Sequence, residues 1–184
     1  MKKYPYPKYE VNRLIISDIV RIVLTVAVLY YTKIPIFWKI IIIMVADKLD
    51  CTHLHSPRFG PLLSSNINIC KTPLYQQADK ITDTICYILI LHYVIHHGGL
   101  SPIYNKILIG LLVYRIIGTI LYLVTNNRLY LVYFPNLFLE ICLALMVIKH
   151  YPKLEKYKTE IFIGVVIIKM ITEYYLHIFK APPS

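Results

Sequence analysis

Residues 103–124 read IYNKILIGLLVYRIIGTILYLV, a mostly apolar run whose only charged residues are Lys106 and Arg115. Continuous apolar runs of about 17–25 residues are typical of helices that cross a lipid bilayer. Similar segments lie on both sides of it, at about 14–31, 34–49, 80–97, 129–149 and 159–179. The sequence therefore predicts an all-α, polytopic membrane protein with about six transmembrane helices, forming a single transmembrane domain over residues 1–184.

The composition agrees with this prediction, since 57% of the residues are hydrophobic and 16% are charged. The charged residues gather between the apolar runs, as expected for loops in water and helices in lipid. A net charge of +10 would favour a nucleic-acid partner in a soluble protein. Here Lys and Arg flank the segments and would face anionic lipid headgroups, so we expect membrane lipids and no nucleic acid as partners.

One connection is much longer than the others and is polar. Residues from about 50 to 78 contain Pro57, Gly60, Pro61 and Pro73 among Ser, Asn and Thr residues, which predicts an inserted polar loop. Long loops are often functional. A slight excess of Lys and Arg on the side of this loop places it and both termini in the cytoplasm.

Four of the ten acidic residues bracket this loop. Asp47 and Asp50 end the second segment, and Asp79 and Asp83 begin the third. Spacings of three and four residues put each pair on one helix face, so the two pairs could form a cage of carboxylates for one or two divalent cations. Mg²⁺ and Mn²⁺ prefer such oxygen ligands. The other interpretation is that these are ordinary charges at helix ends in water.

This arrangement resembles the signature of the CDP-alcohol phosphatidyltransferase family, D-x2-D-G-x2-A-R-x8-G-x3-D-x3-D. The matching residues are Asp47-x2-Asp50 and Asp79-x3-Asp83, between the second and third segments. Asp18-Ile-Val-Arg21 in the first segment is similar to the polar-x-x-Arg near the start of the family's first helix. Arg115 stands where many members have an arginine within the membrane. A mid-span arginine needs a partner or water, so we expect Arg115 to face a polar cavity or to reach a water-filled edge.

The resemblance implies transfer from a CDP-linked lipid or alcohol donor to a hydroxyl acceptor, with release of CMP at the cytoplasmic face, and a possible homodimer. It implies two Mg²⁺ or Mn²⁺ ions held by Asp47, Asp50, Asp79 and Asp83. Asp83 would share metal binding or act as the catalytic base. The expected substrate-binding residues are basic and would meet phosphate groups: Arg58, Arg115, Arg21 and Lys80.

The signature is incomplete in its nucleotide-binding half. Cys51 replaces the glycine after the second aspartate, and Tyr75 replaces the glycine four residues before the third. Pro57-Arg58 lies three residues beyond the place of the family's Ala-Arg, and about eleven residues are inserted before Asp79. Two interpretations therefore stand: a divergent metal-dependent transferase, and a catalytically inactive membrane scaffold with the same fold.

Two other patterns suggest different functions. His92-Tyr-Val-Ile-His96-His97 matches the HxxxHH box of membrane di-iron enzymes, but those need about eight histidines and the chain has seven, so interfacial histidines are the favoured interpretation. Glu140 and Glu173 lie deep in the fifth and sixth segments, as in a cation transporter. We expect each of them to pair with Arg115 or Lys169.

Overall fold

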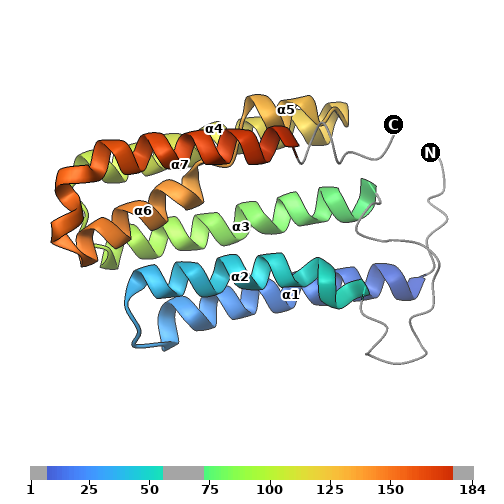
Figure 1. Ribbon diagram of the computed structural model, residues 1–184. Helices are drawn as coiled ribbons and strands as arrows, with labels where there is room; N and C mark the ends of the chain where they lie inside the picture. Colours follow the sequence, from blue (N-terminus) through green and yellow to red (C-terminus); the bar gives the residue numbers. More distant parts are fainter. Residues whose placement is uncertain (1–7, 56–72, 176–184) are drawn as a thin grey trace.

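The computed structural model describes residues 8–55 and 73–175, except for the side chains of residues 8–10, 13 and 48–55. Within these ranges the fold is all-α, as predicted (Figure 1). The elements, in chain order, are α1 (Lys8–Tyr31), α2 (Ile36–His55), α3 (Pro73–His97), α4 (Pro102–Thr125), α5 (Leu129–Tyr133), α6 (Phe138–His150), the 3-10 helix η4 (Pro152–Tyr157) and α7 (Lys158–Tyr174).

Local sequence signals set both ends of α4. The Ser101 hydroxyl accepts a hydrogen bond from the Tyr104 N–H at 3.5 Å, and Pro102 occupies the first turn, where a missing N–H leaves no hydrogen bond unmade. The helix ends at Asn126, whose φ of 55° is left-handed. Asparagine tolerates this conformation better than most residues. The predicted segment 103–124 therefore coincides with α4.

The polar loop predicted at 50–78 is too long, because both of its ends are helical in the structure. Helix α2 continues to His55 and α3 begins at Pro73. The sequence has no proline or glycine between Asp50 and His55, and Pro57 disfavours helix in the residue before it. Pro73 was interpreted as a loop residue, but proline is favoured at the first position of a helix. Residues 56–72 lie outside the described residues.

The predicted segment 129–149 is broken into α5 and α6 at Pro135. Proline donates no backbone hydrogen bond, and a side chain from another helix satisfies carbonyls before it. Nη1 of Arg115, on α4, donates to the carbonyl oxygens of Phe134 at 2.7 Å and Leu131 at 3.5 Å. Gly118, one turn further along α4, makes room for this break, because a Cβ there would overlap the Phe134 side chain.

Three segments in the described part of the chain are long and apolar enough to cross a membrane: Leu14–Tyr31, Pro102–Thr125 and Leu129–His150. The other three predicted spans are not in this group. Helices α2 and α3 carry several charged residues, and α3 also ends in histidines. The described part of α7 has 17 residues, which is at the short limit for a span.

The core is formed where α6 contacts α2, α4 and α7, while α3 contacts α1 and α4 (Figure 1). Leu29, Ile40, Ile90, Leu108 and Cys142 have no exposed surface. The outer surface is apolar as well: more than half of the side-chain surface is exposed at Val23 on α1, Ile120 on α4 and Ile168 on α7. Such a large exposed apolar surface indicates contact with lipid or with another protein.

Candidate metal centre

Helices α2 and α3 bring three of the four predicted aspartates together. Asp47 comes from α2, and Asp79 and Asp83 lie one turn apart on α3. Each offers one carboxylate oxygen, and these oxygens all lie within 4.8 Å of one another. Asp50 also belongs to α2, but its side chain is outside the described residues. Three converging carboxylates are a ligand set that suits Mg²⁺ or Mn²⁺.

Arg21 lies at the centre of these carboxylates. Its Nη1 donates to Asp79 Oδ1 at 2.9 Å and its Nη2 to Asp83 Oδ1 at 2.6 Å. Nη2 also pairs with Asp47. The guanidinium is 7% exposed, and its planar array of donors suits several carboxylates at once. Sequence reasoning expected Arg21 to meet a substrate phosphate, whereas its contacts in the structure are with the aspartates.

Lys80 adds a second positive charge to this group. Its Nζ lies 2.7 Å from Asp79 Oδ2 and 3.3 Å from Asp83 Oδ2. We call Arg21, Lys80, Asp47, Asp79 and Asp83 the Arg21 cluster. With three carboxylates and two cations, the described side chains of the cluster carry a net charge of −1 when all are ionised. Carboxylates this close repel one another in a medium of low dielectric, and the two cations offset that repulsion.

A polar cavity of about 140 Å³ lies against the Arg21 cluster. The residues that line it include Asp47, Lys80, Asp83 and Arg115. The Arg115 side chain is buried and its hydrogen bonds to protein go to the carbonyls before Pro135 through Nη1. The cavity is therefore lined by charged groups of both signs from α2, α3 and α4.

Asn136 and Tyr87 also line this cavity, and sequence reasoning did not select them. Nδ2 of Asn136 donates to the Tyr87 hydroxyl at 2.7 Å, and both residues are at least nine-tenths buried. The signal that was available is Pro135 directly before Asn136, since proline in an apolar run predicts a break. A polar side chain at such a break reaches into the bundle.

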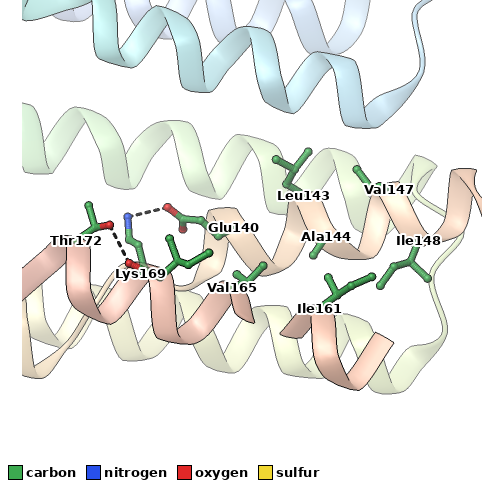
Figure 2. Close-up of a pocket in the computed structure, with 10 residues that line it drawn as sticks. Glu140, Leu143, Ala144, Val147, Ile148, Ile161, Val165, Lys169 and Thr172 are labelled. Atoms are coloured by element: carbon green, nitrogen blue, oxygen red, sulfur yellow. Dashed lines mark hydrogen bonds and ion pairs between the residues drawn. The ribbon is translucent and has the colours of Figure 1, made fainter. Parts of the chain in front are cut away.

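A second ion group, between α6 and α7, also lines the cavity. Figure 2 shows two of its members, Glu140 and Lys169. Lys169 Nζ lies 2.7 Å from Glu140 Oε1 and 3.1 Å from Glu173 Oε1. We call these three residues the Lys169 cluster. Of the two cations that sequence reasoning considered for the glutamates, Lys169 is the one that pairs with both. Its net charge, with all groups ionised, is also −1.

The remaining predicted site residues are located as follows. Arg58 lies outside the described residues. The histidines of the HxxxHH pattern lie at the other end of α3, where Nδ1 of His92 is 2.8 Å from the Tyr30 hydroxyl. Among the described residues, Asp47, Asp79 and Asp83 form the only group of three or more acidic, histidine or cysteine side chains close enough to share one ion.

Comparison of this chain with protein-family models, with curated proteins and with solved structures finds no match. The geometry of the cavity and of its two ion clusters therefore carries the functional argument, together with the sequence pattern.

Proposed function

We propose that this chain is a multi-pass integral membrane protein and a divergent, metal-dependent transferase of the CDP-alcohol phosphatidyltransferase type. It would take a CDP-linked lipid or alcohol as donor, use a hydroxyl compound as acceptor and release CMP, with the site at the cytoplasmic face. The observation that carries this proposal is the convergence of Asp47, Asp79 and Asp83 from two helices. The spacing within each aspartate pair, Asp47-x2-Asp50 and Asp79-x3-Asp83, is that of the family signature, although about eleven residues are inserted between the two pairs.

Six membrane spans are supported by where the charged groups of α2 and α3 lie. Lys39 of α2 is 3% exposed, and its Nζ donates to the Leu29 carbonyl at 2.6 Å and the Tyr93 hydroxyl at 2.8 Å. Asp83 of α3 is buried within the Arg21 cluster. Because these charges face inward and are paired, they do not prevent α2 and α3 from spanning a bilayer beside α1, α4 and α6.

The carboxylates of Asp47, Asp79 and Asp83 would hold one or two divalent ions, with Asp50 one turn along α2 as a further candidate. The ions would neutralise the diphosphate and stabilise the CMP that leaves. The acceptor oxygen forms a bond to the phosphorus that carries the donated group, while the bond from that phosphorus to the CMP oxygen breaks. Asp83 is the candidate to accept the proton from the acceptor hydroxyl.

Arg21 and a divalent cation would compete for the same three carboxylates. The net charge of −1 favours a further cation, and the cluster can accept one only if the guanidinium withdraws from at least some of its partners. Withdrawal would leave Arg21 beside the metal site, at hand for a phosphate oxygen of the donor.

The second candidate function is a membrane scaffold without catalysis. It is favoured by the pairing of Arg21 with all three carboxylates, which satisfies them without a metal. It is favoured also by Cys51 and Tyr75, which replace glycines of the nucleotide-binding half of the signature. The two functions differ in whether Mn²⁺ binds and whether CMP is released.

The deciding experiment measures CMP release by purified protein in lipid, with CDP-diacylglycerol and glycerol or with CDP-choline and dioleoylglycerol as donor and hydroxyl acceptor, in the presence and absence of Mn²⁺. We expect release that requires Mn²⁺ and is abolished in Asp79→Asn, because that variant removes a metal ligand. The matched control is Glu155→Gln, which changes a carboxylate of the exposed Glu155–Lys158 pair. It should leave CMP release unchanged.

The fold of Asp79→Asn is checked by its melting temperature. Full activity in this variant would contradict the proposal that Asp79 binds a metal needed for CMP release. A folded wild-type protein that releases no CMP from either donor would favour the scaffold.

A further inference from the structure

A groove of about 440 Å³ runs between α6 and α7 (Figure 2). Its walls are mostly aliphatic, with Leu143 and Val147 on α6 and Ile161 and Val165 on α7. The volume falls within the range of about 300–1,000 Å³ that is usual for small-molecule sites. An apolar groove on the outside of a helical bundle in a bilayer is a place for a hydrocarbon chain.

The groove leads to the polar cavity. Glu140, Lys169 and Thr172 line both of them, so the Lys169 cluster forms the boundary between an apolar channel and a charged one. A ligand that fills both must be amphiphilic, with a hydrocarbon chain in the groove and a polar head at Glu140. The head would then share one cavity with Asp47 and Asp83.

The hydrogen bonds at this boundary indicate the chemistry of the head. Oε1 of Glu140 pairs with Lys169, whereas its Oε2 is buried and accepts no hydrogen bond from any of the described residues. A buried carboxylate oxygen without a donor is strongly unfavourable. The ligand that completes this site therefore has to supply an N–H or O–H group at the end of its hydrocarbon chain.

We infer that the α6–α7 groove binds a lipid alcohol, with one acyl chain along the groove and the free hydroxyl donating to Glu140 Oε2. Lipids whose head oxygens are all esterified or methylated, and that carry no N–H group, offer only acceptors to this carboxylate, so they do not complete the site. The inference rests on the proposed function in one respect: it makes the lipid the hydroxyl acceptor of that reaction, and not the CDP-linked donor. In the reaction the bound hydroxyl would turn from Glu140 to Asp83, which lines the same cavity, and give up its proton there.

The test compares two lipids that differ only in the hydroxyl group. Radiolabelled dioleoylglycerol is bound to the purified full-length protein in detergent, without nucleotide, and is displaced by unlabelled dioleoylglycerol or by its 3-O-methyl ether. We expect the ether to bind about tenfold more weakly or worse, since a hydrogen bond to a charged group is lost. Equal displacement by the two lipids would overturn the inference.

A matched pair of variants locates the acyl chain. Val165→Phe fills the groove and should reduce dioleoylglycerol binding at least tenfold. Ile163→Phe adds the same ring two residues away on α7, at a side chain that is 55% exposed and does not line the groove, and should bind the lipid as the wild-type protein does. Equal binding by both variants, with unchanged melting temperatures, would also overturn the inference.

These measurements fail separately from the proposed function because they need neither metal nor nucleotide. A protein that prefers dioleoylglycerol over its ether and releases no CMP would leave the lipid site standing and remove the transferase. Release of CMP by a protein that does not distinguish the two lipids would support the transferase and remove the lipid site.

Discussion

The Arg21 cluster and the Lys169 cluster carry the same excess charge in different arrangements. In the first, three carboxylates from two helices surround a guanidinium from a third helix, and Lys80 adds a second cation. In the second, the ammonium group of Lys169 pairs with two carboxylates. One is that of Glu140 on α6, and the other is that of Glu173, one turn after Lys169 on α7. Counted over its described side chains, each cluster has a net charge of −1 when every group is ionised.

This net negative charge has a different consequence at each place. Around Arg21 the carboxylate oxygens converge within 4.8 Å, so a divalent cation could contact all three. Among the described members of the Lys169 cluster, the buried oxygen that accepts no hydrogen bond is Glu140 Oε2, for which one hydrogen-bond donor is sufficient. Geometry, and not net charge, therefore separates a candidate metal centre from a candidate lipid-head site.

The largest expected effect is that of Arg21→Met. This variant leaves three carboxylates facing one another in the bundle, and breaking a buried charge network in this way typically costs about 3–5 kcal/mol. We expect a large fall in the melting temperature of the detergent-solubilised protein. Adding Mn²⁺ should restore part of it, because the ion replaces the lost charge. An Arg21→Met protein as stable as the wild type would show that the carboxylates do not depend on this guanidinium.

Lys169→Met should have a smaller effect, about 1–3 kcal/mol, because Lys169 pairs with two carboxylates, whereas Arg21 pairs with three. The melting temperature is again the measurement. Mn²⁺ should give no recovery here, since two carboxylates do not make the convergent set found around Arg21. Recovery by Mn²⁺ equal to that of Arg21→Met would contradict the distinction between the two clusters.

The sequence predicted the meeting of Asp47, Asp79 and Asp83 because both aspartate pairs lie at the same end of neighbouring helices and each pair shares a helix face. It did not predict that Arg21 lies among them. Contact between α1 and the aspartates depends on how far each helix is rotated about its axis, and an apolar segment such as 14–31 has few features that fix this rotation. Residue type alone equally favoured a phosphate as the partner of Arg21.

Two of the errors in helix boundaries involve proline. Pro73 starts α3, although it was interpreted as part of a loop, and Pro135 divides a segment that was interpreted as one span. In both cases the position of the proline relative to the helix decides its effect, since the first turn tolerates it and the interior does not. Arg115 could be selected from sequence as a buried charge, but its carbonyl partners at Leu131 and Phe134 exist only because of the break at Pro135.

Lys80→Met tests how the charge of Lys80 affects the affinity of the Arg21 cluster for Mn²⁺. Lys80 pairs with Asp79 and Asp83, so its charge opposes a divalent cation at the same carboxylates. Removing it should tighten Mn²⁺ binding about tenfold, which corresponds to about 1.4 kcal/mol. Titration of Mn²⁺ followed by electron paramagnetic resonance measures this affinity. Lys169→Met is the control and should leave it unchanged; weaker binding in Lys80→Met would mean that the lysine supports the ion.

The smallest expected effect is that of Lys158→Met, which isolates the contribution of burial. Lys158 lies 2.7 Å from Glu155, the same distance as Lys169 from Glu140, but these side chains are 39% and 55% exposed against 15% and 23% in the buried pair. An ion pair in water is screened and contributes little, so the melting temperature should not change measurably. If Lys158→Met destabilised the protein as much as Lys169→Met, the removal of any lysine charge would explain both results. A difference between the two variants assigns the effect to the low-dielectric surroundings of Glu140, on which the inferred lipid site depends.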